Sequence, residues 1–303
     1  LADALAEVLP CSVLNESGQR FRAKDECRTG FTDFPNAYNA FVEAVYIEGH
    51  TDIIPVSPRG LRGDPKLNTN LKLSINTNLG IPDKLYDRLV EKLVQLEESG
   101  RIKELTIFTS VDTYGKQADY IRNGLEFDVW QERVDELLSS TKKLSIAIMS
   151  TFNALSVPKY ADLVDWVFEQ KTKHNSPDRH WVTSLTLDSA YLRYPTHQIV
   201  KILPKEWRDT LESIAVQMET LHTVKPLWEI EDWKDHYLGF TQIEIGKVRR
   251  IIDWFDEPMD EEEQNKLRRN FFNMFQAHDK RRGTDFKETF PELAEFYDEC
   301  GKL

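Results

Sequence analysis

The sequence predicts an α/β protein in which a partial parallel (β/α) barrel is followed by a helical C-terminal region. Three observations lead to this fold class. Strand and helix patterns alternate in the middle of the chain, helical patterns alone continue to its end, and the first part shows little regular structure. With 303 residues, 40% of them hydrophobic, the chain is long enough for one or two domains. We therefore divide it into residues 1–74, 75–203 and 204–303.

The first part, residues 1–74, is expected to be an incomplete α+β segment. A short amphipathic helix over residues 2–9 leads into loop, and an apolar strand follows over residues 41–50. The next stretch, TDIIPVSPRGLRGDPKLNTN, is rich in proline and glycine, which favour turns. This is too little regular structure to close a hydrophobic core by itself.

The middle part alternates regularly between strands and helices. Leu85, Leu89, Leu93 and Leu96 recur at helical spacing after Pro82, which suits a first helical turn. Connections this short imply parallel strands with right-handed crossovers. Four strands are too few for a closed eight-stranded barrel, so a partial barrel or an open sheet is expected. The expected strands cover residues 71–79, 104–112, 143–152 and 181–189, and the expected helices cover 82–99, 128–140 and 157–173.

Polar residues stand where three of these strands end, and they are the candidate site. Because the carboxyl ends of parallel strands meet at one edge of a sheet, their side chains are brought to the same region. Amides, hydroxyls and a carboxylate can bind ribose hydroxyls and an amino-acid head group. The alternative is that these side chains cap the helices that follow. The residues concerned are Asn76, Asn78, Ser110, Asp112 and Asn153.

Several long phrases resemble a known family. SINTNLGIPDKLYDRLV, TIFTSVDTYGKQADYIRNGLEFDVW and IAIMSTFNALSVPKYADLVDWV resemble, in this order, the later barrel strands of radical S-adenosylmethionine (SAM) proteins that carry a short twitch domain. YLRYPTHQIVKILP and the tail from FFNMFQAHDK onward resemble the C-terminal part of the same proteins. The resemblance covers residues 71–303.

The resemblance implies a cofactor pocket at the strand ends. In that family the barrel holds SAM against a [4Fe–4S] cluster, whose ligands come from a CxxxCxxC motif. Asn76, Asn78, Ser110 and Asn153 would face the ribose and methionine ends of SAM, with Asp112 beside them. A loop after the second strand would be formed by Tyr120, Ile121, Arg122 and Gly124, and Arg122 would bind a substrate carboxylate.

The chain departs from this family in the residues that make radicals. CxxxCxxC is absent, and so is the Gly-Gly-Glu type of motif that helps to bind the SAM amino group. Without thiolate ligands the cluster cannot be held, so we expect no catalysis and at most residual SAM binding. The chain has three cysteines, Cys11, Cys27 and Cys300. Cys11 and Cys27 either pair in an exported protein or remain separate thiols, and Cys300 is expected to be packed.

The first part resembles a different family. VYIEGHTDIIPVSPRGLRGDPKLNTNLKLS is similar to the OmpA-like peptidoglycan-binding domain, with its apolar strand, G-H-T-D turn and later N-x-x-L-S-x-x-R-A. The resemblance implies that Asp52 binds a diaminopimelate end of the cell-wall peptide. The arginine of that pattern is replaced here by Thr77, so half of the ligand site is missing. Peptidoglycan binding is therefore an alternative function.

The two resemblances meet at LKLS, residues 71–74. Each covers an incomplete domain, which suggests a recombined gene or a misjoined sequence. A third alternative is accordingly a chimeric product without a stable function.

Charge and hydropathy restrict partners and location. The formal net charge of −12 repels phosphate backbones, so nucleic-acid binding is not expected. No apolar run is long enough for a membrane helix, and no metal-ligand spacing of His or Cys is found. The run from His278 to Arg282 is interpreted as a solvated helix end. We expect a cytoplasmic protein, or a periplasmic one if residues 1–74 are functional and an export signal or anchor lies upstream.

Overall fold

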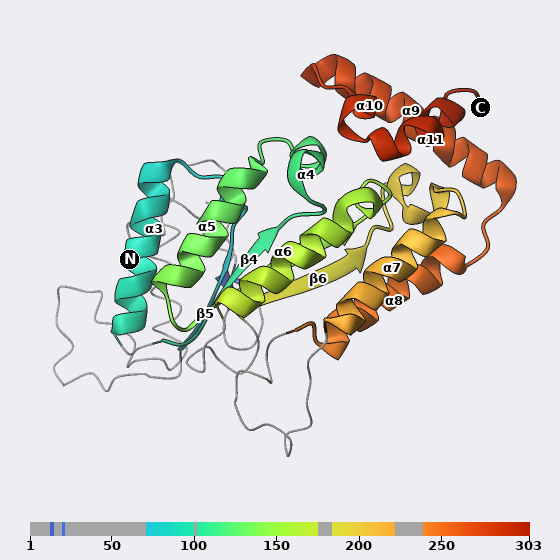
Figure 1. The fold of residues 1–303 in the computed structure, drawn as a ribbon. Helices are drawn as coiled ribbons and strands as arrows, with labels where there is room; N and C mark the ends of the chain where they lie inside the picture. The colour runs from blue at the N-terminus through green and yellow to red at the C-terminus, as the bar shows by residue number, and fades with distance from the viewer. Residues whose placement is uncertain (1–12, 15–19, 22–70, 100–101, 175–183, 222–238) are drawn as a thin grey trace. The chain divides into compact units, whose positions relative to one another are not determined.

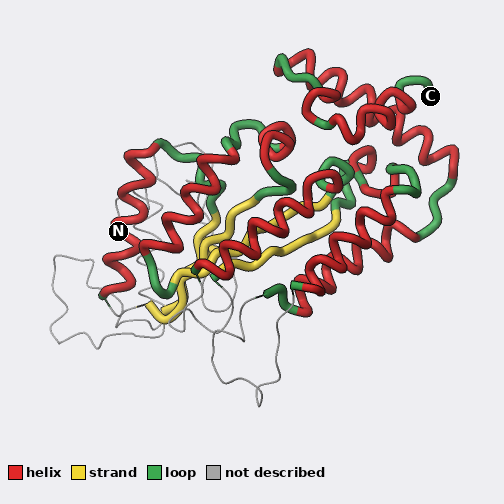
Figure 2. Tube along the Cα trace, in the orientation of Figure 1, coloured by secondary structure: helices red, strands yellow, loops and turns green. Residues whose placement is uncertain are grey.

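A computed structural model describes residues 13–14, 20–21, 71–99, 102–174, 184–221 and 239–303. It has an α/β fold with a four-strand parallel sheet and a predominance of helix (Figures 1 and 2). The α/β class predicted from the sequence is thus confirmed at this level. The expected helix over residues 2–9, the expected strand over residues 41–50 and Asp52 lie outside the described residues.

The sheet has the strand order β2-β1-β3-β4-β5-β6. Its parallel strands are β3 (Leu71–Asn76), β4 (Ile102–Ser110), β5 (Leu144–Phe152) and β6 (Leu185–Tyr191). In the β3–β4 register, Ile75 lies opposite Ile107 and Asn76 opposite Phe108. Two short strands continue the sheet: β1 (Val13–Leu14) pairs antiparallel with β3, and β2 (Arg20–Phe21) pairs antiparallel with β1. The expected strand over residues 71–79 therefore ends three residues early.

Helices connect the parallel strands and then form the C-terminal region. The expected helices before and after β4 and after β5 are present, each within a few residues of its expected bounds. No helix of the described residues is long and apolar enough to span a membrane. The helices are α3 (Asp83–Glu98), α4 (Gly115–Ile121), α5 (Phe127–Ser140), η3 (Val157–Lys159), α6 (Tyr160–Lys173), η4 (Thr196–Gln198), η5 (Val200–Ile202), α7 (Trp207–Thr220), α8 (Gln242–Asp256), α9 (Glu261–Arg282), α10 (Phe286–Thr289), η8 (Pro291–Leu293) and α11 (Ala294–Cys300).

Helix α4 corrects one expectation. Tyr120 and Ile121, expected in a loop, form the last residues of this seven-residue helix. The helix starts at Gly115, whose φ of +61° is a left-handed conformation that glycine adopts readily. Seven residues are too few to show a helical period in the sequence or to hold a helix together in water. Burial of Ala118 and Tyr120 supplies the stabilisation that the local sequence lacks.

The chain divides into two compact units. Unit 1 comprises residues 1–109, 132–147 and 176–184, and unit 2 comprises residues 110–131, 148–175 and 185–303. In unit 1, Leu89 and Leu93 of α3 are buried together with the inward side chains of the strands. The inward strand residues include Leu73, Ile75, Leu105, Ile107, Leu144 and Ile146.

Arg133 is the main polar anchor of unit 1. Its Nη2 donates to Asp83 at 2.6 Å and its Nη1 donates to the carbonyl of Leu79. The guanidinium lies over the ring of Tyr86, 4.7 Å from the centroid, and the Tyr86 hydroxyl donates to the Arg133 carbonyl at 2.7 Å. Burial raises the pKa of Tyr86 far above its usual value, so the phenol stays protonated. These contacts fix the middle of α5 against the start of α3.

Unit 2 is largely helical. Helices α6, α7 and α8 lie side by side, and α8 also packs along β6 (Figure 1). The last helices enclose a second, aromatic core, in which Phe286 stacks on Tyr297 with ring centroids 4.4 Å apart. Cys300 is buried there as expected. The other fully or largely buried rings are Phe271, Phe275, Phe290 and Phe296.

A buried ion pair joins three elements of unit 2. The Lys171 ammonium on α6 donates to both carboxylate oxygens of Glu244 on α8, at 2.8 and 2.9 Å, and to the carbonyl of Gly239. Glu244 also accepts the backbone N–H of Leu187 on β6 at 2.8 Å. Burial lowers the pKa of Lys171, while the neighbouring carboxylate opposes that shift. The pair therefore persists because every polar atom in it has a partner.

Glu244 has a second, local role at the start of α8. Its Oε2 accepts the backbone N–H and the hydroxyl of Thr241, and the Thr241 hydroxyl accepts the N–H of Glu244. This capping box satisfies backbone donors that a helix N-terminus otherwise leaves open. One carboxylate thus caps a helix, pairs with a buried cation and binds the edge strand.

We predict that Lys171→Met destabilises the protein by about 3 kcal/mol, because it leaves the Glu244 carboxylate buried without its cation. Urea denaturation followed by circular dichroism measures the change. Lys287→Met is the matched control, since Lys287 pairs with Asp298 on an exposed surface and should matter by less than about 0.5 kcal/mol. Equal stability of the two variants would contradict the large contribution to the free energy of unfolding that we assign to the buried pair.

Candidate functional site

The strand-end residues of unit 1 form a turn. Asn76 is half-buried at the end of β3, and the next N–H, that of Thr77, donates to the carbonyl of Phe108 at 2.9 Å. The exposed Asn78 accepts the N–H of Gly80 at its Oδ1, and Thr77 accepts the N–H of Leu79. Leu79 has a φ of +58°, an unusual value for a residue with a side chain. Asn78 therefore stabilises a tight turn into α3.

In unit 2, Asp112 and Arg122 come together. Asp112 follows β4, and Arg122 is the residue that ends α4. Nη2 of Arg122 donates to Oδ1 of Asp112 at 2.9 Å, and its Nε lies 2.8 Å from Oδ2. The Asp112 side chain is only 5% exposed, whereas that of Arg122 is 32% exposed. One side of the guanidinium therefore holds the buried carboxylate while the rest reaches solvent.

Asp112 also connects two strand ends. Its Oδ1 accepts the backbone N–H of Thr151, near the end of β5, at 2.7 Å. The carboxylate thus receives a charged partner and a backbone donor, which is sufficient to keep it in a nearly buried position. Ser110, two residues earlier on the chain, is half-buried. The arrangement places a carboxylate, a guanidinium and a hydroxyl-bearing residue at the carboxyl end of the sheet in unit 2.

Asn153 makes only local hydrogen bonds. Its Nδ2 donates to the carbonyl of Thr151 at 3.0 Å, and its Oδ1 accepts the N–H of Leu155 at 2.9 Å. Its own N–H donates to the hydroxyl of Ser156 at 3.1 Å. Both heavy atoms of the amide are therefore engaged in shaping the connection to α6. Asn153 therefore stabilises the turn before η3, whose first residue is Val157, and it does not cap that helix.

The strands of unit 2 alternate between a buried and an exposed face. In β5, Ile148 and Ser150 are buried while Met149 and Thr151 are exposed, and in β6 the exposed Ala190 follows the buried Ser189. Parallel sheets are normally covered on both faces, and their strands then read as continuous apolar runs. The exposed side of these strands carries small, polar and thioether side chains, a mixture that suits contact with a partly polar ligand.

An iron–sulfur cluster does not fit the described residues. These residues include no group of three or more His, Cys, Asp and Glu side chains arranged to hold a metal ion. Cys300, the cysteine within them, is 1% exposed, and burial raises the pKa of its thiol to about 12. A protonated, buried thiol is a poor cluster ligand, since thiolates are the species that bind iron. Cys11 and Cys27 lie outside the described residues.

The structure also reveals contacts that the sequence did not suggest. The Tyr120 hydroxyl donates to Asp279 at 2.7 Å across 159 residues, and Gln117 donates to Glu292 at 3.0 Å across 175. No local pattern marks these pairs, because their partners are far apart in the sequence and meet only through packing. The run from His278 to Arg282 is correspondingly divided: Lys280, Arg281 and Arg282 are exposed as expected, whereas His278 and Asp279 are half-buried against Tyr120.

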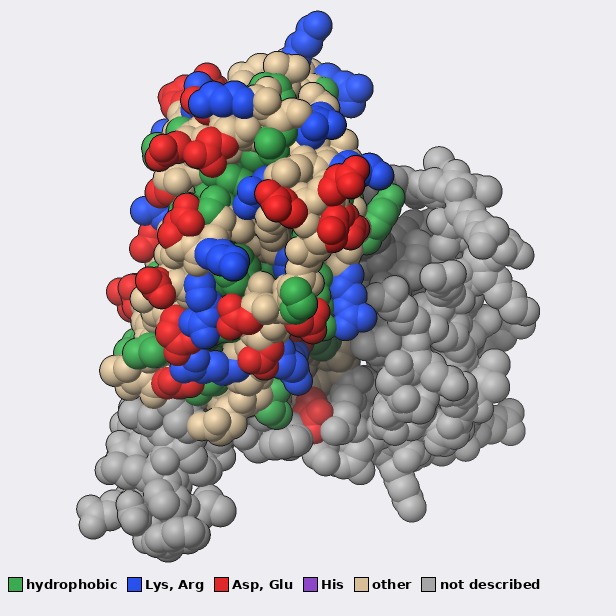
Figure 3. Space-filling view, turned by 90° about the vertical axis from the view of Figure 1, so that its right-hand side faces the viewer, with side chains coloured by type: hydrophobic (Ala, Val, Ile, Leu, Met, Phe, Trp, Pro, Cys, Tyr) green, Lys and Arg blue, Asp and Glu red, His purple; other side chains and the backbone are tan. Residues whose placement is uncertain are grey.

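Charged side chains are mixed on the face drawn in Figure 3, where Lys and Arg alternate with Asp and Glu among the described residues. Several charges of the described residues are paired, as in the network of Arg208 and Arg249 with Glu212 and Glu219. No extended area of a single sign is visible on this face. Such a surface offers no stripe for a polyanion to follow.

Comparisons with protein-family models, with curated proteins and with solved structures found no match for this chain.

We predict that Arg122→Gln destabilises unit 2 by about 1–2 kcal/mol, because it removes the charged partner of a nearly buried carboxylate. In an Asp112→Asn background the same substitution should cost much less, because no buried charge then remains. A double-mutant cycle based on urea denaturation measures the difference. Additive effects of the two substitutions would show that the pair is not coupled.

Proposed function

We propose that residues 71–303 form a SAM-binding module without catalytic activity. The observation that carries the proposal is the group formed by Asp112, Arg122 and the Thr151 N–H at the strand ends of unit 2. In α/β proteins, ligands bind at this end of parallel strands. The resemblance of residues 71–303 to radical SAM proteins supplies the ligand class, and the missing thiolates argue against the radical reaction.

The chemistry of SAM suits the side chains present. Its methionine carboxylate is an anion that the solvent-facing part of the Arg122 guanidinium can bind by paired hydrogen bonds. Its ribose hydroxyls can donate to an Asp carboxylate or exchange hydrogen bonds with the Ser110 hydroxyl. The exposed Met149 offers a polarisable surface for an adenine ring. When bound, SAM would present a sulfonium cation near Asp112, whose negative charge favours it.

The proposed roles of the three asparagines differ. They are Asn76, Asn78 and Asn153. The Asn153 amide is already hydrogen-bonded within its own turn, so we assign it the role of fixing the backbone there. Asn76 and Asn78 belong to unit 1, and their role in SAM binding rests on the resemblance. The resemblance implies that Arg122 binds a substrate carboxylate. We propose the methionine carboxylate of SAM as the first candidate for that ligand.

We predict that the purified protein binds SAM weakly, with heat detectable by isothermal titration calorimetry at about 1 mM ligand. Arg122→Gln should weaken the affinity about tenfold, which corresponds to the loss of one charge-assisted contact. Lys287→Gln is the control, because Lys287 is exposed and pairs with Asp298, and this variant should bind as the wild type does. The absence of both heat and a thermal shift with SAM would refute the proposal. Stoichiometric iron in the purified protein would refute its noncatalytic part.

Peptidoglycan binding through residues 1–74 is the second proposal. It rests on the phrase VYIEGHTD, whose last residue is Asp52, and on the strand–turn pattern of the OmpA-like family. In that reading the module would act in the periplasm and anchor the chain to the cell wall. The replacement of the expected arginine by Thr77 removes one of the two groups that would bind the peptide, so any binding should be weak.

We predict that, if the N-terminal segment is functional, the protein sediments with purified peptidoglycan sacculi and Asp52→Ala abolishes this association. Asp33→Ala, in the same segment but outside the G-H-T-D turn, is the matched control. Sedimentation that does not respond to Asp52→Ala would dismiss a specific site.

A further inference from the structure

Helix α4 connects the Asp112 site with the C-terminal helices. It begins three residues after Asp112, and the residue that follows it is Arg122. The N–H of Arg122 donates to the carbonyl of Ala118 at 2.9 Å, so the backbone of Arg122 closes the last helical turn. Any shift of α4 therefore moves the guanidinium that binds Asp112.

Tyr120 attaches α4 to α9. Its hydroxyl donates to Oδ1 of Asp279 at 2.7 Å, and its ring lies 4.5 Å from the ring of His278. Phe275, Phe286 and Phe290 surround the same ring with centroids 5.2 to 6.1 Å away. Burial, followed by the Asp279 hydrogen bond, raises the pKa of Tyr120 well above its usual value, so the phenol remains a donor.

Asp279 is held in place from its own side. Its Oδ1 accepts the Thr284 hydroxyl at 2.7 Å, and its Oδ2 accepts the N–H of Phe286 at 2.8 Å. The carbonyl of Asp279 accepts the N–H of Gly283, whose φ of +68° ends α9 and turns the chain back. The acceptor for Tyr120 thus lies in the last turn of α9 and is hydrogen-bonded to the segment that leads into α10.

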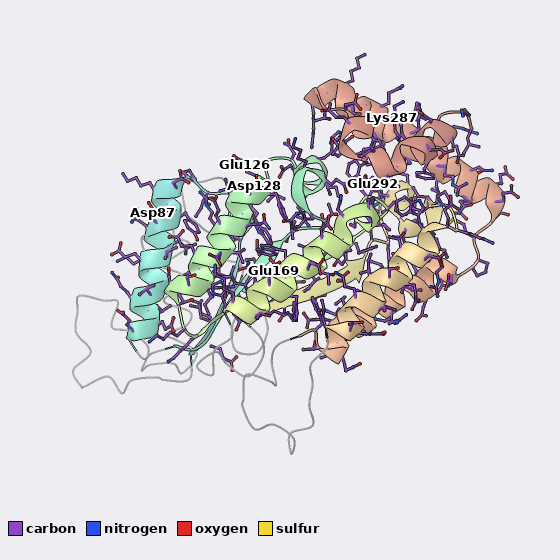
Figure 4. The ribbon with its side chains drawn as sticks, in the orientation of Figure 1. Asp87, Glu126, Asp128, Glu169, Lys287 and Glu292 are labelled. Atoms are coloured by element: carbon purple, nitrogen blue, oxygen red, sulfur yellow. The ribbon has the colours of Figure 1, made fainter. Side chains whose placement is uncertain are left out.

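A second attachment lies one helical turn earlier. Gln117 donates from its Nε2 to the carbonyl of Thr289 at 3.2 Å and to Glu292 at 3.0 Å. Figure 4 labels Glu292 and, on α10, Lys287, which pairs with Asp298 within the C-terminal helices. Gln117 and Tyr120 are three residues apart, so both lie on the face of α4 that meets those helices.

We propose that helices α9–α11 act as a clamp on α4 that positions Arg122 at Asp112, with Tyr120 and Asp279 as the positioning residues. This inference deepens the proposed function, and it rests on that function where SAM is the ligand. A seven-residue helix is marginal by itself, so its position depends on tertiary contacts. The guanidinium of Arg122 makes one hydrogen bond to Asp112 and approaches its second oxygen at 2.8 Å, so a small displacement of α4 weakens this contact.

The test substitution is Tyr120→Phe, which removes one hydrogen bond and keeps the aromatic packing. Asp279→Asn is a second variant that keeps the shape of the turn. Tyr297→Phe is the matched control, because it removes from the same aromatic core a phenol hydroxyl that makes no hydrogen bond to α4. Each substitution is made in the full chain.

Hydrogen exchange followed by NMR gives the first readout and needs no ligand. Tyr120→Phe should lower the protection of the Arg122 and Thr151 amides about tenfold and leave that of Leu187, bound to Glu244, unchanged. Tyr297→Phe should spare all three amides. A uniform loss that includes Leu187 would mean general destabilisation and would overturn the clamp, as would unchanged Arg122 and Thr151 amides.

SAM affinity by calorimetry gives the second readout. Tyr120→Phe should weaken binding about fivefold in the wild-type background and have no effect in an Arg122→Gln background, because its action passes through Arg122. Equal weakening in both backgrounds would overturn the positioning role. If the wild type binds no SAM, the proposed function fails, and the exchange experiment alone decides whether the clamp exists.

Discussion

The arrangement of α6, α8 and β6 in unit 2 depends on the hydrogen bonds and the ion pair that the Glu244 carboxylate makes. A strand at the edge of a sheet exposes backbone donors and acceptors that invite pairing with other chains. Here β6 ends the strand order, and Glu244 of the adjoining helix α8 takes the Leu187 N–H. Because the same carboxylate binds Lys171 of α6, the edge strand is fixed between two helices. An open sheet of few parallel strands can persist in this way without closing into a barrel.

Asp112 and Asp279 repeat this principle. Each carboxylate accepts a backbone N–H from one segment and a side-chain donor from another, and so links two segments of the chain. Such carboxylates are costly to bury unless all their partners are in place. In unit 2 the Glu244, Asp112 and Asp279 carboxylates, each with several hydrogen bonds, fix how helices and strand ends are placed. The apolar and aromatic side chains supply most of the buried surface. Specific geometry and bulk stability come from different residues.

The sequence predicts the parts of this fold that have a strong local period. The four parallel strands and helices α3, α5 and α6 follow from alternation, leucine spacing and the position of Pro82. Helix α4 escapes prediction because seven residues hold less than two full turns. In the candidate site, the sequence predicts that Asp112 lies at a strand end. Its pairing with Arg122 and Thr151 depends on the turns between elements, which the sequence pattern does not predict. Tyr120 and Asp279 meet only through the packing of the C-terminal helices, which no local pattern encodes.

The distance along the chain between Tyr120 and Asp279 has a consequence for biosynthesis. These residues are 159 positions apart. At translation rates of about 5–20 residues per second, roughly 8–30 s pass between the synthesis of the phenol and that of its acceptor. During this interval α4 is on the nascent chain without its hydrogen bonds to the C-terminal helices. Under the proposed clamp, the contact between Arg122 and Asp112 reaches its final geometry only after Asp279 has been synthesised.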